Sequence, residues 1–249
     1  MFETIHYFRN NPYFNAFVST RFQGAMNVKA GEDGKKNREY FFSQNTNSSS
    51  KLFVADVEHK SKALVVNGNK IPGPVNKIDA LITSEEEIYL GMPFADCHPL
   101  ILSSFTFERR PILALVHAGY NSLVYGVIAN TVLAMKNTGA RIKKIWAFIG
   151  PGICTKCYEF GPEAPRVFRK YGEYIKQDIK TGKYLVDLKG IILTQLISAH
   201  IEKDNISASR LCTYETPYLF SARREKMRPE DPQNLVKTCM IFAGIKKRV

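Results

Sequence analysis

Residues 99–118 read PLILSSFTFERRPILALVHA and contain two apolar runs, PLILSS and PILALVHA, separated by the charged segment FERR. Both runs are rich in aliphatic and β-branched residues, which favours strands, and the short polar connection favours a hairpin. If the strands pair antiparallel, Cys97 before the first strand and His117 at the end of the second return to the same end of the sheet. The hairpin therefore predicts that a thiol and an imidazole lie close together.

Further strand-like runs occur on both sides of this hairpin. They are FNAFVST, KLFVADV, KALVVN, DALIT, EIYLGM, KIWAFIG, KYLVDL, ASRLCTY and KTCMIFA. Apolar residues at helical spacing predict helices within residues 121–139, 161–177 and 187–205. Two segments rich in Gly, Ser, Asn and charge, residues 29–37 and 43–51, are expected to be loops. The pattern predicts an α+β fold: a single layered domain over residues 1–249, with a mixed β-sheet core and peripheral helices.

Composition limits the classes of partner. The formal net charge is +12, which favours anionic ligands, but the basic residues are spread along the chain without interleaved aromatics, so no nucleic-acid partner is expected. No run of eighteen apolar residues and no apolar leader is present, so we expect no membrane association and a cytoplasmic location. We expect a monomer or a homodimer.

The cysteines are odd in number. Five of them in a chain without a secretory leader indicate reduced thiols rather than a disulfide framework. The motif CTKC, with Cys154 and Cys157, admits three interpretations: half of a structural zinc site with Cys212 and Cys239, a redox pair, or ordinary thiols. The last is favoured, because neither distant cysteine has a partner at short spacing.

The hairpin pair needs a third ligand to hold a metal. His59 ends the run KLFVADVEH, and His98 is the other candidate. One cysteine with two histidines and an open fourth position suits a catalytic zinc ion, and the alternative is a structural histidine beside an inert buried cysteine. Side chains alternate along a strand, so we expect His98 to face away from Cys97. Asp96 is costly to bury alone, so it is expected to orient a ligand histidine or to bind substrate.

The motifs, taken together, resemble a known family. In chain order they are STRFQG, MNVKAGEDGKKNRE, VEH, DALIT, ADCHP, VHAG, IGPGI, YEFG, CTY and FSARR. Their order and spacing are similar to those of the family variously called multicopper polyphenol oxidase, laccase-domain or YfiH-type purine nucleoside phosphorylase. The resemblance covers most of the chain and implies that His59, Cys97 and His117 are the metal ligands, and we expect these three residues and Asp96 to form the catalytic site.

The resemblance also implies an activity. It implies phosphorolysis of adenosine, inosine and S-methyl-5′-thioadenosine, with adenosine deamination as a further reaction, so purine nucleosides and phosphate are the expected partners and zinc, or copper, the expected cofactor. Phosphorolysis needs cationic or polar groups for phosphate. The candidates within family-like motifs are Asn27, Arg38, Arg223 and Arg224.

Two other functions stay open. A true laccase gathers several coppers with more histidines than the five of this chain, but copper can occupy a single Cys/His site and support oxidation of phenols. The third class is a non-catalytic nucleoside-binding protein, because Tyr120, Asn121 and Ser122 stand where the family usually has Trp-Arg-Gly. These departures beside the ligands leave the preferred nucleoside open.

Overall fold

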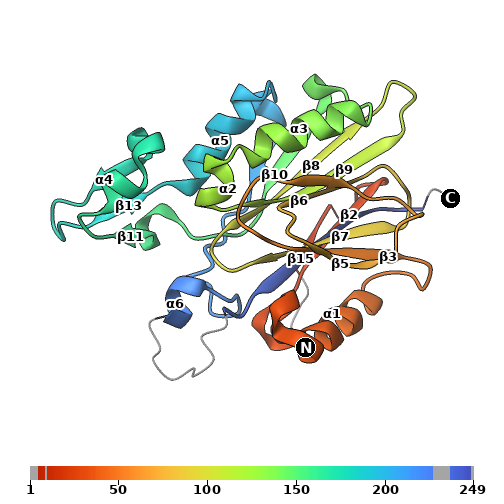
Figure 1. Ribbon diagram of the computed structural model, residues 1–249, viewed down its shortest axis with the longest axis horizontal. Coiled ribbons are helices and arrows are strands. Elements are labelled where there is room, and N and C mark those ends of the chain that lie inside the picture. Colours follow the sequence, from red (N-terminus) through yellow and green to blue (C-terminus); the bar gives the residue numbers. More distant parts are fainter. Residues whose placement is uncertain (1–4, 9, 227–235, 248–249) are drawn as a thin grey trace.

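Two packed sheets form the centre of the computed structural model, which describes residues 5–8, 10–226 and 236–247 (Figure 1). Within these residues the first sheet has the strand order β1 (Ile5–Tyr7), β2 (Phe14–Val18), β15 (Cys239–Ile245), β7 (Ile88–Phe94), β3 (Lys51–Asp56) and β5 (Gly73–Asn76). The second sheet, over the same residues, has the order β14 (Ile206–Ala208), β10 (Trp146–Ile149), β8 (His98–Phe105), β9 (Pro111–Ala118), β6 (Ala80–Thr83) and β4 (Ala63–Val65). Both sheets combine parallel and antiparallel pairs, which confirms the predicted mixed core.

The central strands are buried on both faces. In β9, Leu113 and Leu115 point into the cluster shared by the two sheets, whereas Ala114 and Val116 belong to the cluster beneath the helices. A strand without a solvent face needs no polar alternation, which explains why PILALVHA is almost continuously apolar. Each large aliphatic side chain buried in this way stabilises the fold by roughly 1.5–3 kcal/mol relative to exposure.

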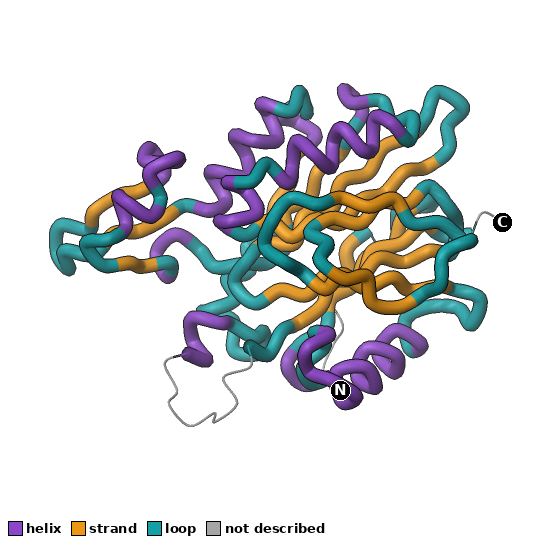
Figure 2. The backbone as a smooth tube through the Cα atoms, viewed as in Figure 1, coloured by secondary structure: helices purple, strands orange, loops and turns teal. Residues whose placement is uncertain are grey.

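Helices cover the outer face of each sheet. The second sheet carries α2 (Tyr120–Val124), α3 (Val127–Asn137) and α5 (Leu188–Ser198), and the first carries α1 (Gly31–Ser43) (Figures 1 and 2). The molecule is thus layered as helix, sheet, sheet and helix. The predicted helix over residues 121–139 is divided into α2 and α3 at Gly126, whose φ of 80° lies in the left-handed region.

A small extension projects from one end of the sandwich (Figure 1). It contains the third sheet, with the order β11 (Glu159–Phe160), β13 (Tyr184–Val186) and β12 (Ile175–Gln177), and also α4 (Ala164–Val167) and the 3₁₀ helix η5 (Arg169–Tyr174). Phe168 is buried between the rings of Tyr120 and Phe160, with centroid distances of 4.3 and 4.6 Å. This aromatic contact joins the extension to α2. The remaining helices are η1 (Arg21–Gln23), η2 (Val28–Ala30), η3 (Ile142–Lys144), η4 (Thr155–Cys157), η6 (Lys203–Asn205) and α6 (Ala222–Lys226).

The hairpin prediction is confirmed. Strands β8 and β9 pair antiparallel over their whole length, with Pro99 opposite His117 and Phe105 opposite Pro111. The predicted strands at FNAFVST, KLFVADV, KALVVN, DALIT, EIYLGM, KIWAFIG, KYLVDL and KTCMIFA are also present. The run ASRLCTY was assigned wrongly: β14 ends at Ala208, and Cys212 forms only an isolated bridge with Gly152.

Two other local predictions were wrong. Residues 29–37 were expected to be a loop, but residues 31–43 form α1, because Phe41 and Phe42 dock on the first sheet and override weak local helix propensity. Residues 161–177 were expected to be one helix, but they form α4, η5 and β12. Tyr171 has non-helical dihedral angles there, and Ile175 pairs with β13 instead of continuing a helix.

Three connections cross from the first sheet to the second. They join β3 to β4, β5 to β6 and β7 to β8. His59 lies in the first of them, Asp79 in the second and Cys97 in the third. Three crossings between the same two sheets thereby supply residues with polar side chains to the region where the hairpin places His117.

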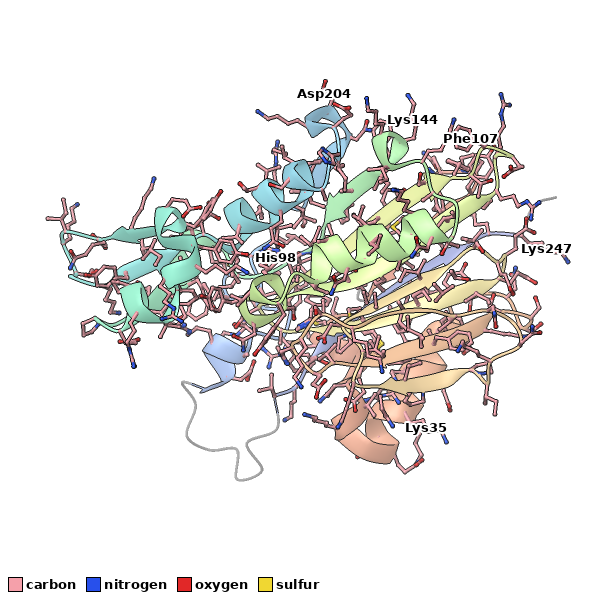
Figure 3. All side chains as sticks on the ribbon, turned by 45° about the horizontal axis from the view of Figure 1, so that its top comes forward. Lys35, His98, Phe107, Lys144, Asp204 and Lys247 are labelled. Atoms are coloured by element: carbon pink, nitrogen blue, oxygen red, sulfur yellow. The ribbon has the colours of Figure 1, made fainter. Side chains whose placement is uncertain are left out.

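Basic side chains lie on more than one side of the molecule. Lys35, Lys144 and Lys247 lie at separate edges of the molecule, whereas His98 lies in its interior (Figure 3). Within the described residues, no helix has both the length and the apolar character needed to cross a bilayer.

Candidate metal centre and adjoining cavity

Three metal-ligand side chains meet where the crossings leave the sandwich. One ligand atom each of His59, Cys97 and His117 lies within 4.8 Å of the other two. His117 is in β9, Cys97 directly precedes β8, and His59 follows β3 by three residues. The rings of the two histidines are perpendicular, at 88°, with their centroids 4.7 Å apart. The structure therefore brings together the three residues that the sequence predicted as ligands.

The backbone around the cysteine is tightly constrained. A Cβ atom at Gly119 would lie 2.5 Å from Sγ of Cys97, so only glycine fits after the His117 strand without displacing the thiol. His59 and Asp96 both have positive φ, at 60° and 88°, a conformation that side chains other than glycine adopt at a cost of order 1 kcal/mol. Backbone strain on two crossings thus falls on one ligand, His59, and on Asp96, the residue before a second ligand.

The electrostatics of the metal-free group favour a thiolate. Burial would raise the pKa of Cys97, but the charge and hydrogen bond of His117, with a smaller contribution from His59, lower that pKa to about 6. Burial would lower the pKa of His117, but the Cys97 thiolate and the Asp79 carboxylate raise it to about 9. At neutral pH the pair is therefore a thiolate beside an imidazolium, and a metal ion must displace the His117 proton.

Asp79 supports the two histidines and was missed by the sequence analysis. Its side chain is fully buried, and its two oxygens accept the backbone N–H groups of His59 and Lys60 at 2.8 Å each. Its Oδ1 also lies 3.7 Å from Nδ1 of His117. Burial raises the pKa of Asp79, but the contact with His117 and the two backbone donors lower it overall. A carboxylate behind metal-ligating histidines commonly fixes their orientation, and the only sequence signal was its place at the start of DALIT.

Asp96 is held by hydrogen bonds to other parts of the protein, whereas a residue that only contacts substrate would need none. Its Oδ1 accepts the Thr213 hydroxyl at 2.6 Å, and its Oδ2 accepts the backbone N–H of Arg223 at 2.6 Å. Its carbonyl accepts the N–H of Ile153 at 2.9 Å. Asp96, which directly precedes Cys97, is therefore hydrogen-bonded to the three segments that contain Ile153, Thr213 and Arg223. Its catalytic role stays a prediction.

A cavity of about 590 Å³ adjoins the three ligands. This volume lies within the range of small-molecule sites. Its wall contains His59, Cys97 and His117, the aromatic side chains of Phe94, Tyr158 and Phe160, and the polar side chains of Asn27, Lys29, Asp56 and Arg223. The cavity thus combines one metal-ligand group, aromatic side chains, two cationic side chains and the carboxylates of Asp56 and Asp96.

The four predicted phosphate-binding residues separate into two pairs. Asn27 and Arg223 line the cavity. Arg38 and Arg224 are outside its described lining, because their guanidinium groups bind backbone carbonyls: Arg38 those of Met26 and Asn27, and Arg224 those of the segment from Thr213 to Leu219. Lys29 lines the cavity and was not selected from the sequence, because it lay in the segment taken for a loop.

His98 is separate from the ligand group. Its ring is fully buried, its Nδ1 lies 2.9 Å from the carbonyl oxygen of Gly150, and it packs against Gly152, where a Cβ atom would lie 2.4 Å from that nitrogen. Burial lowers the pKa of His98 to about 4, so the ring is neutral at physiological pH. With His98 excluded, the candidate ligands are His59, Cys97 and His117. One thiolate and two imidazoles that face a cavity have the chemistry of a catalytic zinc or a copper site.

Comparison with known proteins gives concordant results. Residues 20–229 match the family model described as multi-copper polyphenol oxidoreductase laccase. Adenosine deaminase RL5, from an unknown prokaryotic organism, is 31% identical over 69% of this chain and 65% of its own, and purine nucleoside phosphorylase of Deinococcus radiodurans is 32% identical over 59% and 56%. The chain thus spans about two thirds or less of the length of these relatives. The crystal structure of YlmD from Geobacillus stearothermophilus shares the fold, with a TM-score of 0.78 and 21% identity over 98% of this chain and 100% of that one.

Proposed function

The chain belongs to the multi-copper polyphenol oxidoreductase laccase family, and from this premise we propose that it is a zinc-dependent purine nucleoside phosphorylase. The proposed substrates are adenosine, inosine and S-methyl-5′-thioadenosine, with adenosine deamination as a second reaction. The observation that carries the proposal is the cavity in which His59, Cys97 and His117 share a wall with aromatic and cationic side chains. The names of two relatives, an adenosine deaminase and a purine nucleoside phosphorylase, support it.

The metal would be held by His59, Cys97 and His117. When bound, zinc supplies a Lewis acid that acidifies water for the deamination reaction. The chain's own contribution is to keep the Cys97 thiol ionised and to hold His117 by Asp79. Asp79 also fixes the backbone of His59, so both histidines depend on one carboxylate.

The cationic part of the cavity suits phosphate. Arg223 and Lys29 both line the cavity, and the amide of Asn27 adds a hydrogen-bonding group. The Arg223 guanidinium lies over the rings of Tyr158 and Phe160, 5.5 and 5.0 Å from their centroids, and its Nη1 donates to the Glu159 carbonyl at 2.5 Å. These contacts fix the guanidinium while its other N–H groups can bind an anion, as phosphorolysis requires.

The aromatic part suits a purine. Phe94, Tyr158 and Phe160 line the same cavity, and the faces of such rings stack on planar heterocycles. Burial, the largest influence, raises the pKa of Tyr158 well above its usual range, so its hydroxyl keeps the proton and can donate a hydrogen bond. A base held on these rings would place the attached ribose toward the metal ligands and the cations.

A product assay tests the proposal. Zinc-loaded protein is incubated with each of the three nucleosides, with and without phosphate, and the products are separated by chromatography. Phosphorolysis gives free base and ribose 1-phosphate (the 5-methylthio derivative from methylthioadenosine) only when phosphate is present, whereas deamination converts adenosine to inosine in both conditions. Binding of the nucleosides without any product would overturn the proposal in favour of a non-catalytic binding protein.

Substitution of one cation tests the assignment of the phosphate site. Arg223→Gln should raise the KM for phosphate about ten- to a hundredfold, because one charge-assisted contact is worth about 1.5–3 kcal/mol, with a smaller change in deamination. Arg166→Gln is the matched control, since Arg166 is an exposed residue of α4. An unchanged KM for phosphate in the Arg223 variant would remove this residue from the proposed phosphate site.

A copper-dependent oxidase is a second candidate, favoured by the donor set itself. One thiolate and two imidazoles also suit copper, which binds such ligands more tightly than zinc does. The test is the metal content of the protein as isolated, together with a thiolate-to-copper absorption band and oxidation of phenols. Loss of both in Cys97→Ala would support this candidate, and zinc as the resident metal without phenol oxidation would contradict it.

A further inference from the structure

A second group of potential metal ligands lies outside the centre described above. Ligand atoms of Cys154, Cys157, Cys212 and Glu215 all lie within 4.8 Å of one another. Cys239, the fourth cysteine in the zinc alternative for the CTKC motif, is not part of this group: it is buried in β15, and its Sγ accepts the N–H of Phe220. Glu215 stands in its place.

Short-range contacts assemble this cluster from two segments. Cys154 precedes the 3₁₀ turn Thr155–Cys157, which brings the two cysteines of CTKC to one side. Cys212 reaches them through the isolated bridge with Gly152, and its Sγ accepts the N–H of Cys154 at 3.2 Å. Hydrogen bonds from backbone N–H groups to sulfur are typical support for thiolate ligands.

We propose that Cys154, Cys157, Cys212 and Glu215 bind a second, structural zinc ion. A tetrahedral zinc ion with Zn–S bonds of about 2.3 Å holds its sulfur ligands roughly 3.8 Å apart. The present separations, all within 4.8 Å, need a contraction of at most about 1 Å to reach that geometry. The spacing C-x-x-C is also the usual one for two ligands of a structural zinc site.

The carboxylate distinguishes a metal site from a disulfide. Oε2 of Glu215 lies 3.9 Å from Sγ of Cys154, and its Oε1 binds Nζ of Lys156 at 2.7 Å. A disulfide would use two of the thiols and leave the third thiol and the carboxylate, which is paired with Lys156, outside the linkage. A divalent ion uses all four groups, and Lys156 offsets part of the remaining negative charge.

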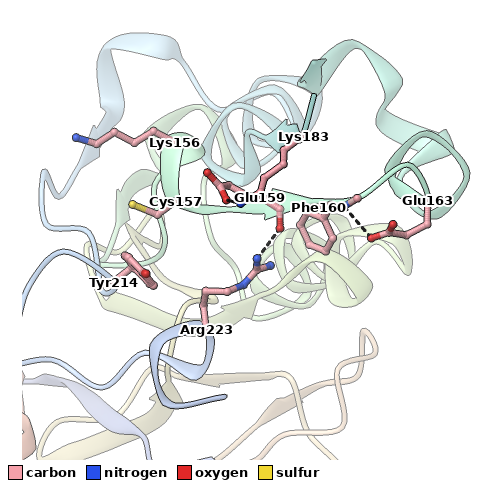
Figure 4. Close-up of a pocket in the computed structure, with 9 residues that line it drawn as sticks. Lys156, Cys157, Glu159, Phe160, Glu163, Lys183, Tyr214 and Arg223 are labelled. Atoms are coloured by element: carbon pink, nitrogen blue, oxygen red, sulfur yellow. Dashed lines mark hydrogen bonds and ion pairs between the residues drawn. The ribbon is translucent and has the colours of Figure 1, made fainter. Parts of the chain in front are cut away.

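The cluster would fix one side of the candidate active site. Thr213, next to Cys212, donates to Asp96, and Tyr158, next to Cys157, lines the cavity of about 590 Å³. Cys157 and Tyr214 line a neighbouring pocket of about 530 Å³, across which Arg223 reaches the Glu159 carbonyl (Figure 4). Zinc bound here would link the segment of residues 154–160 to that of residues 212–215.

Metal counting tests the inference on the intact chain. We expect two zinc ions in the wild type, one in Cys157→Ser, one in Cys97→Ala and none in the double variant, measured by mass spectrometry of the metal. Cys239→Ala, which removes a thiol outside the cluster, should keep two. If the metal site at Cys97 does not exist, the wild type carries one zinc, which is lost in Cys157→Ser and kept in Cys97→Ala, so the two hypotheses fail separately.

A second measurement avoids dependence on the folding of the Cys157 variant. In Cys97→Ala, X-ray absorption at the zinc edge should show a shell dominated by sulfur at about 2.3 Å. Alkylation of the same protein should spare Cys154, Cys157 and Cys212 until a chelator is added, as mapped by peptide mass spectrometry. A zinc-free Cys97→Ala protein, or alkylation of the three cysteines that is equal with and without chelator, would overturn the proposal.

Discussion

The two clusters of potential metal ligands in this protein differ in the number of ligands and in what surrounds them. The group of His59, Cys97 and His117 offers three ligands at the ends of sheet crossings and faces a cavity. The group of Cys154, Cys157, Cys212 and Glu215 offers four, drawn from loops tied by an isolated bridge. Three ligands leave a position for substrate or water, whereas four complete a tetrahedron. One chain can thus place a ligand group suited to catalysis in one region and a ligand group suited to structural metal binding in another.

The largest expected effect is the loss of enzymatic activity when the first cluster is disrupted. Cys97→Ala should lower kcat/KM for nucleoside turnover about a thousandfold, or about 4 kcal/mol, because it removes a ligand of the proposed catalytic metal. Cys239→Ala is the control, and its turnover per folded molecule should equal that of the wild type. Turnover by Cys97→Ala within tenfold of the wild type would contradict the assignment.

The next effect separates them by stability. Cys157→Ser should lower the unfolding free energy by about 3 kcal/mol and the thermal midpoint by about 10 °C, because the loss of a structural metal removes binding energy from the folded state. Turnover per folded molecule should fall less than tenfold. A calorimetric scan with a parallel activity assay measures both, and a thousandfold loss of turnover at an unchanged midpoint would reverse the roles of the clusters.

The pH dependence of zinc affinity should also differ. In Cys157→Ser the remaining centre has Cys97 and His117 with pKa values of about 6 and 9, so between pH 7 and 8 zinc displaces one proton and its affinity rises about tenfold. In Cys97→Ala the remaining cluster includes Cys154 and Cys157. Their pKa values are raised mainly by burial and to a smaller extent by neighbouring thiols. At least two protons leave there, so the affinity should rise about a hundredfold.

Competition with a chelator of known pH dependence measures both slopes. Both affinities should fall on acidification, because protons compete with zinc. Equal slopes in the two variants would show that the protonation states of the clusters do not differ as the structure indicates.

The smallest effect concerns the support of the histidines. Asp79→Asn should weaken zinc binding at the first centre ten- to a hundredfold and leave the second cluster unchanged, since a neutral amide supports the His117 imidazole and the backbone of His59 less well. Asp178→Asn, in the turn between β12 and β13, is the control. An equal loss at both clusters would indicate general destabilisation instead.

The sequence predicted the strands better than the helices, for a physical reason. A run such as PILALVHA must be apolar because both of its faces are buried, so its composition reveals its structure. The helix α1 has poor intrinsic propensity and depends on Phe41 and Phe42 docking on a distant sheet, a contact that no local pattern shows. The same limit applies to residues 161–177, where the regularly spaced apolar residues pack into an aromatic cluster and do not form one continuous helix.

From the residues alone, convergence at the candidate site was predictable only where strand pairing determined it, and His59 was assigned as the third ligand through the family resemblance. The pairing of β8 with β9 places Cys97 near His117, and the alternation of side chains separates His98. Asp79 escaped notice because its role depends on a crossing between sheets. Glu215 escaped because only cysteines were considered as partners of the CTKC motif, although Glu215 follows Cys212 by three residues.

The origin of the ligands on the crossings has a mechanical consequence. His59 and Cys97 lie in connections that pass from the first sheet to the second, and His117 belongs to the second sheet itself. Cys97 directly precedes β8, and the N–H of His59 is bound to Asp79, which directly precedes β6, so all three ligands are attached to one end of the second sheet. A metal held by these three residues would thus tie the first and third crossings to the end of β9, and detachment of these crossings from the second sheet would release the metal.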